Sequence, residues 1–417
     1  MIAPVASRRE PASPIAVTDA TPESVAGAAL ARPATKHPAL TRLALTDFRC
    51  YRQLRLGTDE RPVVLTGPNG AGKTNLLEAI SFLAPGRGLR RAKLSECDRV
   101  GEGDVSPALS RPPSSWAVAA TLLTPSGPVD LGTGREAAGQ EGERRIVRIA
   151  GETQRGQAVL AEYLSVAWLT PQMDRLFLEG AGPRRRFLDR LVFGFDPGHA
   201  RRLAAYDHGM RERARLLADG ARDTAWLAAL EDGMASDGVA VAAARREAVQ
   251  RLNRAQDGRR GPFPAAELGL KGTIETWLGE MPALAAEERF RSLLVDSRRR
   301  DAEAGGAIDG PHRSDLTAHH RIKGMPAAQC STGEQKAMLI AIVLADAWLQ
   351  HESRSAPILL LDEVAAHLDE ARRRALFDEL LTLGTQAWLT GTDAHLFDPL
   401  GRHAQHFRVF DATIHPA

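Results

Sequence analysis

The stretch Gly67-Pro68-Asn69-Gly70-Ala71-Gly72-Lys73-Thr74 fits the pattern G-x-x-x-x-G-K-[ST] at every fixed position. The run Pro62–Thr66 before it is short, apolar and β-branched, which predicts a buried strand. Apolar residues with helical spacing follow it at Asn75–Leu83. A strand, a glycine-rich turn and a helix in this order predict a loop that binds phosphate through backbone amides and the helix N-terminus, with a chance glycine-rich turn as the alternative.

The chemistry of such a loop gives each side chain a role. We expect Lys73 to reach the β- and γ-phosphates of a nucleotide and the Thr74 hydroxyl to ligate Mg²⁺. Asn69 is interpreted as facing the γ-phosphate or the attacking water, with turn formation as the alternative. The expected nucleotide-binding residues of this segment are Gly67, Pro68, Asn69, Gly70, Ala71, Gly72, Lys73, Thr74 and Asn75.

An acidic partner for this loop occurs far downstream. The apolar run 357–361 is followed by Asp362 and Glu363. Such a run is typical of a parallel strand buried on both faces, and ligands of doubly wound sheets bind at the carboxyl ends of the strands. We therefore predict that Asp362 binds Mg²⁺ and that Glu363 polarises the attacking water.

Composition sets the broad class of the protein. The 417 residues carry a net charge of +2, which argues neither for nor against a polyanionic partner. Only six lysines occur among the 54 basic residues, so clusters of arginine are discounted as a signal. Three scattered cysteines, Cys50, Cys97 and Cys330, lack metal-ligand spacing and favour reduced thiols in a cytoplasmic protein. No segment predicts a signal peptide or a membrane helix.

The order of predicted elements suggests an α/β head that both parts of the chain complete. Residues 1–38 are interpreted as a disordered tail or as a start placed too early. Strands are predicted at 40–45 (an edge strand), 54–56, 116–122, 145–149, 166–170 and 386–390 (the final core strand), with a mobile loop at 132–143. The fold class is a P-loop head with a mixed sheet, an antiparallel subdomain and an inserted helical lobe. The expected parts are 1–38 for the tail, 39–175 for the first part of the head, 176–303 for the lobe, and 304–417 for the second part of the head.

Residues 182–300 have mostly helical spacing, with breaks at 194–198 and 258–264. Between 183 and 300 there are 22 Lys and Arg against 17 Asp and Glu. These charges are interpreted either as solvated helix faces or as a surface that contacts nucleic acid.

A second polar motif, Cys330-Ser331-Thr332-Gly333-Glu334-Gln335-Lys336, opens a long helix from 337 to about 350, with Ser331 or Thr332 as its N-cap. In this order and spacing it resembles the signature motif of ABC-type ATPases, in which two heads sandwich two nucleotides. The resemblance implies that Ser331 and Gly333 contact the γ-phosphate bound to the opposite protomer and that Asp369 matches the D-loop. It also implies a catalytic set of Glu363 as base, Lys73, and Gln172, which senses Mg²⁺ and the attacking water.

Within that class the chain resembles the RecF family of bacterial recombination mediators, which is related to chromosome-maintenance ATPase heads. Stretches that carry the resemblance are 45–51, 182–189, 310–315 and 331–336. A compact insertion replaces the long coiled coils of the chromosome-maintenance proteins. Transporter heads place a histidine after the last strand, where this chain has Thr390-Gly391-Thr392-Asp393. Ser314 stands where the family usually has a second acidic residue.

This resemblance implies an ATP- and Mg²⁺-dependent homodimer that binds DNA at gaps or single-strand/double-strand junctions, independently of sequence. It also implies a cytoplasmic protein of DNA repair, replication, recombination and the SOS response, which acts with RecO and RecR to load RecA. Its hydrolysis of ATP is expected to be slow and stimulated by DNA, and to release the dimer. The alternatives are an ATPase that drives another partner, such as a membrane protein, or a nucleotide-gated scaffold that needs no turnover.

Candidate DNA contacts lie in two arginine-rich segments. They are Arg87, Arg90, Arg91 and Lys93, with a solvated loop as the alternative, and Arg184 and Arg185, with a structural role or an ion pair to Asp189 as the alternative. Three consecutive arginines at 184–186 cannot all face one side of a helix. His312 and Arg313 are interpreted either as part of a nucleotide-dependent interface or as residues that hold the insertion on the head.

Overall fold

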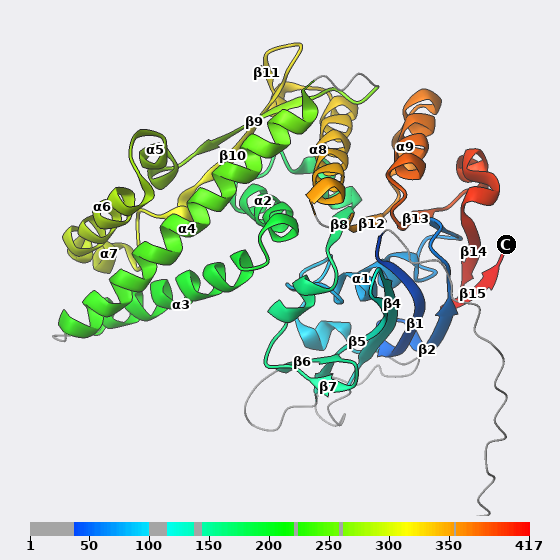
Figure 1. The fold of residues 1–417 in the computed structure, drawn as a ribbon, viewed down its shortest axis with the longest axis horizontal. Coiled ribbons are helices and arrows are strands. Elements are labelled where there is room, and N and C mark those ends of the chain that lie inside the picture. Colours follow the sequence, from blue (N-terminus) through cyan, green and yellow to red (C-terminus); the bar gives the residue numbers. More distant parts are fainter. Residues whose placement is uncertain (1–36, 100–114, 137–143, 221–223, 258–261, 354–355) are drawn as a thin grey trace, which may run out of the picture. The chain divides into compact units, whose positions relative to one another are not determined.

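The computed structural model describes residues 37–99, 115–136, 144–220, 224–257, 262–353 and 356–417 (Figure 1). The predicted tail therefore lies outside the described residues, except for its last two positions. The part of the predicted loop from 137 to 143 lies outside them as well.

A six-stranded sheet carries the phosphate-binding loop, with the strand order β15-β14-β3-β13-β12-β8. Its strands are β3 (Val63–Thr66), β8 (Val166–Leu169), β12 (Ile358–Leu361), β13 (Ala387–Gly391), β14 (Gln405–Phe410) and β15 (Thr413–Pro416). All neighbouring pairs are parallel except β14 with β15. The prediction that 386–390 is the final core strand was wrong, because β14 follows it and pairs with β3 on the side opposite β13.

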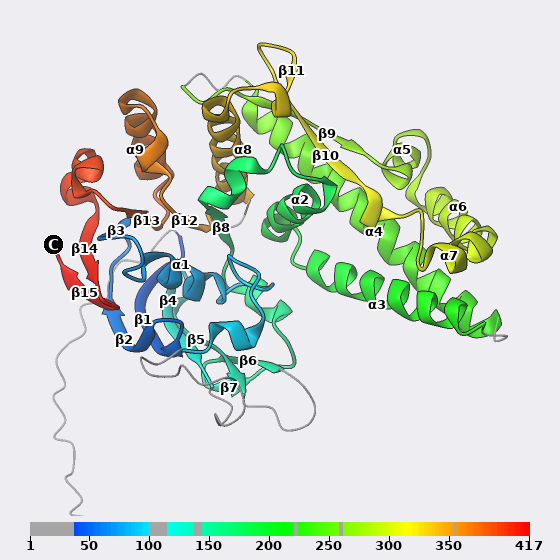
Figure 2. The ribbon, with the colours of Figure 1, turned by 180° about the vertical axis from the view of Figure 1, so that it is seen from behind.

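Alternation along β12 divides the interior of this region into two cores. Ile358 and Leu360 pack with α1 (Lys73–Ser81) and the second large sheet, whereas Leu359 and Leu361 pack with α8 (Thr332–Ser353) and α9 (Glu370–Leu383). All four side chains are buried, as expected for a strand covered on both faces. Figure 2 shows α8 and α9 on the side of the sheet away from α1.

The second large sheet is antiparallel and has the order β2-β1-β4-β5-β6-β7. Its strands are β1 (Ala39–Phe48), β2 (Tyr51–Gly57), β4 (Ala117–Thr124), β5 (Gly127–Glu136), β6 (Arg144–Ile149) and β7 (Glu152–Thr153). The prediction of an edge strand at 40–45 was wrong, since β1 pairs with both β2 and β4. Residues 132–136 belong to β5 rather than to a loop. A Cβ on Gly134 would lie 2.6 Å from the Trp116 carbonyl oxygen, so this glycine allows a close strand contact instead of a turn.

Within its described residues, the predicted helical segment contains six α-helices and one strand that the helical spacing did not reveal. The helices are α2 (Ala181–Phe195), α3 (His199–Ala218), α4 (Thr224–Gln256), α5 (Thr273–Glu280), α6 (Ala283–Asp296) and α7 (Arg298–Ala304). The strand β9 (Ala266–Lys271) pairs with β10 (Asp315–His320), which also pairs with β11 (Met325–Pro326). α3 and α4 lie side by side, with α6 and α7 packed against them (Figure 1). We refer to α2–α7 with β9 as the helical lobe and to the two large sheets with α1, α8 and α9 as the head.

Short 3₁₀ segments connect these elements. They are η1 (Leu94–Cys97), η2 (Ala158–Glu162), η3 (Pro171–Arg175), η4 (Pro311–Arg313), η5 (Ala327–Gln329), η6 (Ala365–His367) and η7 (Ala394–His403). The helix predicted from 337 begins earlier, at Thr332, directly after Ser331. No helix within the described ranges has the length and hydropathy needed to cross a bilayer.

Candidate functional site

Neighbouring elements shape the glycine-rich loop between β3 and α1. Gly67 has φ of 151°, and a Cβ there would lie 2.1 Å from the Val409 carbonyl oxygen of β14. Gly72 has φ of 111°, and a Cβ there would lie 2.7 Å from the Tyr51 hydroxyl oxygen. That hydroxyl donates a hydrogen bond to the Gly72 carbonyl at 3.1 Å. Two glycines are therefore required both by backbone conformation and by close contacts.

The Lys73 side chain lies along the loop that precedes it. Its Nζ donates to the Gly67 and Pro68 carbonyl oxygens at 2.7 and 2.8 Å. The pKa of Lys73 is lowered by burial, and the opposing effect of the nearby Glu363 and Asp362 carboxylates is smaller. The buried ammonium is thus held by two carbonyl oxygens of the loop itself.

The Thr74 hydroxyl and the Asp362 carboxylate meet where β3 and β12 end. Thr74 Oγ1 lies 3.0 and 3.1 Å from the two carboxylate oxygens, and Thr390 Oγ1 at the end of β13 donates to Oδ1 at 2.7 Å. Burial raises the pKa of Asp362, because desolvation penalises the charged carboxylate. Hydroxyl and carboxylate oxygens are ligands that Mg²⁺ prefers, so this pair fits the metal. The parallel sheet brings together two residues that are far apart in the sequence.

Thr390 is a site residue that the motif search missed. It donates to Asp362 and also accepts the backbone N–H of Glu363 at 2.9 Å. The only available signal was its position at the end of a core strand, where polar residues meet ligands. The stretch that departs from transporter heads therefore orients the acidic pair.

Glu363 adopts an unusual backbone conformation directly after Asp362. Its φ is 52°, in the left-handed region that non-glycine residues rarely occupy. The side chain is partly exposed beyond the sheet edge, and the hydrogen bond to Thr390 holds the turn. Strained residues held by their surroundings gather at functional sites, and this geometry suits a carboxylate aimed at a bound water.

Gln172 follows the strand next to β12. It lies exposed in η3, three residues after the end of β8, and the Asp362 N–H donates to the Leu169 carbonyl at 2.9 Å. Gln172 is therefore on the same edge of the sheet as the loop and the acidic pair. No hydrogen bond of its side chain to these groups is present among the described residues.

Behind the loop, α1 is anchored by a buried carboxylate. Glu78 is fully buried, and Arg49 donates to both of its oxygens at 2.9 and 2.8 Å. Arg90 reaches the same carboxylate at 3.3 Å and donates to the Asn75 amide oxygen at 2.8 Å. Of the arginines proposed to contact DNA, Arg90 thus has partners within the molecule. The sequence pattern around Arg49, Glu78 and Arg90 did not predict this network.

The signature-like motif forms an exposed helix N-terminus. The Ser331 Oγ accepts from the Glu334 N–H at 3.3 Å and the Glu334 carboxylate accepts the Ser331 backbone N–H at 3.0 Å, which is a capping box. Glu334 also pairs with Lys323, which lowers its pKa to about 2, together with its bonds to Ser331. Ser331 and Gly333 are exposed, and no hydrogen bond joins them to the Gly67–Thr74 loop within the described part of the chain. This end of α8 is free to face another molecule.

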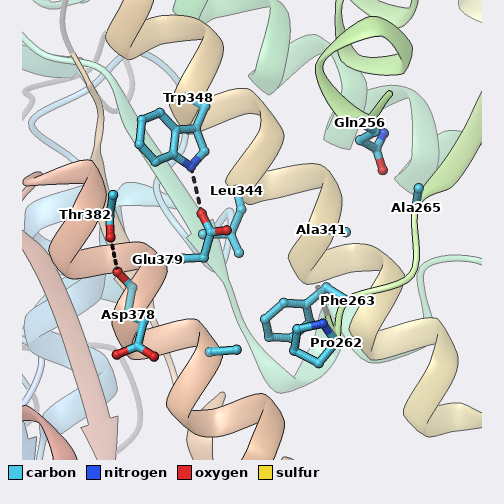
Figure 3. Close-up of a pocket in the computed structure, with 11 residues that line it drawn as sticks. Gln256, Pro262, Phe263, Ala265, Ala341, Leu344, Trp348, Asp378, Glu379 and Thr382 are labelled. Carbon is cyan, nitrogen blue, oxygen red and sulfur yellow. Dashed lines mark hydrogen bonds between the residues drawn. The ribbon is translucent and has the colours of Figure 1, made fainter. Parts of the chain in front are cut away.

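Asp369 caps the N-terminus of α9 in the same manner. Its carboxylate accepts the Arg372 N–H at 2.8 Å and remains exposed. The indole of Trp348 on α8 donates to Glu379 on α9 at 2.8 Å, beside a hollow of about 390 Å³ between the two helices (Figure 3). Phe263, which precedes β9, forms another wall of this hollow. The two helices that follow Ser331 and Asp369 are thereby linked to each other.

The structure separates the candidate DNA contacts into two groups. Arg184 forms a two-pronged contact with Asp315 at 2.8 and 2.9 Å, and Arg185 donates to the Ser314 carbonyl at 2.6 Å. These bonds favour the structural alternative for both side chains. In contrast, Arg87, Arg91 and Lys93 are exposed around the turn after α1.

Asp189 joins helices within the lobe, and His312 holds the lobe against the chain that follows it. Among the described residues, Asp189 forms no ion pair with the arginines at 184–186. Asp189 instead binds Arg245 at 2.7 and 2.9 Å and His199 at 2.9 Å. His312 Nδ1 is 2.8 Å from the Tyr206 hydroxyl on α3, and its Nε2 is 2.9 Å from the Ala307 carbonyl. These contacts favour an anchoring role for His312, whereas Arg313 is exposed.

Comparison with known proteins agrees with this architecture. A profile described as "AAA domain, putative AbiEii toxin, Type IV TA system" matches residues 63–110. The solved "Structure of the recombination mediator protein RecF-ATP in RecFOR pathway" has a TM-score of 0.76 at 20% identity, over 92% of this chain and 98% of that one. A Pyrococcus furiosus Smc head domain has a TM-score of 0.50 at 15% identity, over 91% of this chain and 96% of that one. The fold and the P-loop site define an ABC-type ATPase head.

Sequence relatives narrow this class to one family. The chain is 50% identical over 389 residues to the DNA replication and repair protein RecF of Mesorhizobium japonicum, covering 92% of this chain and 99% of the relative. It is 48% identical over 378 residues to the RecF of Rhizobium meliloti, covering 90% of this chain and 98% of that protein. The chain belongs to the RecF family of DNA replication and repair proteins.

Proposed function

We propose that this protein is a cytoplasmic ATPase that dimerises on DNA when it binds Mg²⁺ and ATP, and that it acts in recombinational repair. The observation that carries the proposal is the division of the candidate residues between two places. Lys73, Thr74 and Asp362 form one nucleotide half-site, whereas Ser331 and Asp369 are exposed at two helix N-termini directed elsewhere. A second copy of the chain supplies the missing half-site in a two-fold dimer.

In this proposal the chain's own residues divide the work of hydrolysis. The loop amides, Gly67–Thr74 and Asn75 hold the phosphates, and Thr74 with Asp362 holds the metal. Bound Mg²⁺ neutralises charge that develops on the phosphates. Glu363 accepts a proton from the attacking water, and Gln172 orients that water at the sheet edge. Ser331, Gly333 and Asp369 of one protomer approach the γ-phosphate held by the other, so its loss releases the dimer.

Dimer closure also brings basic surfaces of two chains together along one DNA backbone. Binding through phosphates is independent of sequence and weakens steeply with salt. The solved relative named as a recombination mediator is placed by its title in the RecFOR pathway. We extend that association to this chain and propose that it works with RecO and RecR at gaps or junctions to help load RecA, with slow, DNA-stimulated turnover.

The first test is the mass of the protein in solution, measured by light scattering with and without Mg²⁺, ATP and gapped DNA. We expect ATP to dimerise the wild type but neither Lys73→Met nor Ser331→Arg. Ser353→Arg is the matched control, because it places the same side chain at the exposed opposite end of α8. Dimerisation that ignores ATP, or loss of dimerisation in the Ser353 control as well, contradicts the proposal.

A second test concerns turnover. Glu363→Gln keeps the size of the side chain but removes its basicity, so we expect a dimer that stays on DNA in ATP. If this variant instead leaves DNA at the wild-type rate in ATP, the result would favour a scaffold that needs no hydrolysis. Co-purification with an integral membrane protein would favour an ATPase that drives another partner.

A further inference from the structure

A cavity of about 640 Å³ opens between the head and the helical lobe. The head contributes the turn 84–91 and the end of β8 with η3, and the lobe contributes α2 and α3. Its walls include Trp168 and Phe187, together with four arginines. Neither the nucleotide half-site nor the exposed ends of α8 and α9 account for this cavity.

The arginine triplet at the start of α2 explains one side of the cavity. Successive helical residues point about 100° apart, so three neighbours cannot share one face. Arg184 and Arg185 bind Asp315 and the Ser314 carbonyl at the end of β10. Arg186 is exposed and lines the cavity instead.

Three of the four cavity arginines have uncommitted guanidinium groups. Within the described ranges, no hydrogen bond or ion pair holds the side chains of Arg87, Arg91 or Arg186. Their neighbour Arg90, in contrast, is bound to Asn75 and Glu78. The fourth cavity arginine, Arg190, lies over the Trp168 ring and forms part of the cavity wall.

Acidic groups on the wall do not cancel these charges. Asp189 is already bound by Arg245 and His199, and Glu179 lies exposed at the rim. Asp207 is exposed on α3, so two exposed carboxylates, Glu179 and Asp207, face three uncommitted arginines. The cavity therefore presents a surplus of positive charge to whatever enters it.

We infer that this cavity holds a backbone phosphate of the bound DNA strand through Arg87, Arg91 and Arg186. The inference rests on the proposed DNA-binding function and assigns it a place. Guanidinium groups match phosphate oxygens in a two-pronged geometry, and two of the three come from the head while one comes from the lobe. A phosphate held by all three bridges the head and the lobe.

The same cavity connects DNA contact with the nucleotide site. Gln172, the candidate that orients the attacking water, lies on its wall. Arg190 of α2 donates to the Trp168 carbonyl at 3.2 Å and contacts the Met173 sulfur at 3.8 Å, on either side of Gln172. A strand that pulls α2 toward the turn 84–91 therefore acts on the segment that carries Gln172.

The test measures binding of a fluorescein-labelled gapped duplex by anisotropy, with Mg²⁺ and ATP, over a series of salt concentrations. We expect Arg87→Ala, Arg91→Ala and Arg186→Ala each to weaken binding by about tenfold. Each should also reduce the salt dependence by about one phosphate contact. Arg186→Lys keeps the charge and should recover part of the affinity. Arg55→Ala on β2 and Arg300→Ala on α7 are exposed controls outside the cavity and should bind as the wild type does.

Two further readouts make the outcome decisive. DNA stimulation of ATP hydrolysis should fall in the Arg186 variants, because the phosphate no longer bridges α2 to the turn. Wild-type affinity, salt dependence and stimulation in all three alanine variants would overturn the inference while leaving the proposed function intact. A wild type that shows no ATP-dependent DNA binding would overturn the proposed function itself.

A final experiment distinguishes a phosphate of DNA from the phosphate of a free nucleotide, because arginines can bind either one. AMP is titrated into Lys73→Met, in which the P-loop lysine is removed. Binding of AMP that depends on Arg186, combined with unchanged DNA binding by the arginine variants, would make the cavity a mononucleotide site and overturn the assignment to DNA. Absence of AMP binding together with weakened DNA binding supports it.

Discussion

The head and the helical lobe bury different kinds of side chains. The two cores of the head are dominated by aliphatic and aromatic residues from a sheet covered on both faces. The apolar cluster of the lobe is smaller, and a network of charged groups lies beside it. Arg213, Glu231 and Asp301 are each no more than 1% exposed. A few long helices enclose little volume, so ion pairs fix positions there that apolar packing fixes in the head.

The charged network of the lobe has its polar atoms well matched. Arg213 of α3 donates to Glu231 of α4 at 2.9 Å and to Asp301 of α7 at 2.8 Å. Its remaining arm donates to the Leu294 carbonyl of α6, and Arg298 binds the other oxygen of Glu231. One arginine thus joins four helices. Such a network costs desolvation, but removal of a single member leaves buried charges without a partner.

The largest expected effect on stability follows from removal of that arginine. We expect Arg213→Ala to lower the free energy of unfolding by about 3–5 kcal/mol, because the buried Asp301 loses its cation and the buried Glu231 keeps only Arg298. Urea unfolding monitored by circular dichroism measures it. Arg215→Ala on the same helix is the matched control, since Arg215 forms an exposed pair with Glu212 and should cost about 0–1 kcal/mol. Equal losses in the two variants would contradict the contrast between the lobe and the head.

Asp346 is an exception to this contrast, because it is a buried carboxylate within the apolar core of the head. It lies on α8, accepts from Gln350 at 2.9 Å, and its second oxygen has no hydrogen-bond partner among the described residues. Burial raises the pKa of Asp346 to about 8. The native state therefore retains a proton that the unfolded chain releases above pH 4. Stability should fall as the pH rises from about 4 to about 8.

Asp346→Asn removes this ionisation while keeping an acceptor for Gln350. We expect the variant to exceed the wild type in stability by at least about 1 kcal/mol at pH 8, with a smaller difference near pH 5. Urea titrations at both pH values measure the two differences. Asp378→Asn, an exposed position on α9, should leave the pH dependence unchanged. If Asp346→Asn follows the wild-type pH profile, the carboxyl does not titrate as its burial implies.

The sequence was most informative where one strand and one loop make the site. The run 357–361, Asp362 and the P-loop pattern predicted a parallel sheet edge that holds Thr74 against Asp362, and that contact is present. Burial of β12 on both faces is the physical reason, because a strand covered on both faces must be apolar throughout.

Prediction failed where tertiary contacts override local pattern. Glycines at 132–134 suggest a loop but lie in β5, since close packing of Trp116 excludes a side chain at Gly134. Thr390 and Tyr51 support the site from other strands and carry no motif. The partners of Arg184, Asp189 and Arg245 depend on how helices pack, which helical spacing does not specify. The sequence pattern around a charged helical residue is the same whether its side chain faces solvent or a buried partner.

The smallest expected effect concerns one polar bond between head helices. The Trp348 indole donates to Glu379 at 2.8 Å beside the hollow between α8 and α9 (Figure 3). Trp348→Phe keeps an aromatic ring but removes the donor, so we expect a loss of about 0.5–1.5 kcal/mol in unfolding free energy. In the lobe, removal of a hydrogen-bond donor leaves buried charges without a partner. The Glu379 carboxylate, in contrast, stays within reach of solvent, so the loss of stability remains modest.

A double-mutant cycle with Glu379→Ala isolates this bond from the packing of the ring. If the indole and the carboxylate interact, the double variant should be more stable than the sum of the single losses predicts, by about 0.5 kcal/mol or more. Additive losses would mean that the ring contributes only by packing. Because Ser331 and Asp369 directly precede α8 and α9, the same variants should also be scored for ATP-dependent dimerisation. A change in dimerisation larger than the change in stability would show that the spacing of the two helices, and not only their stability, controls the interface.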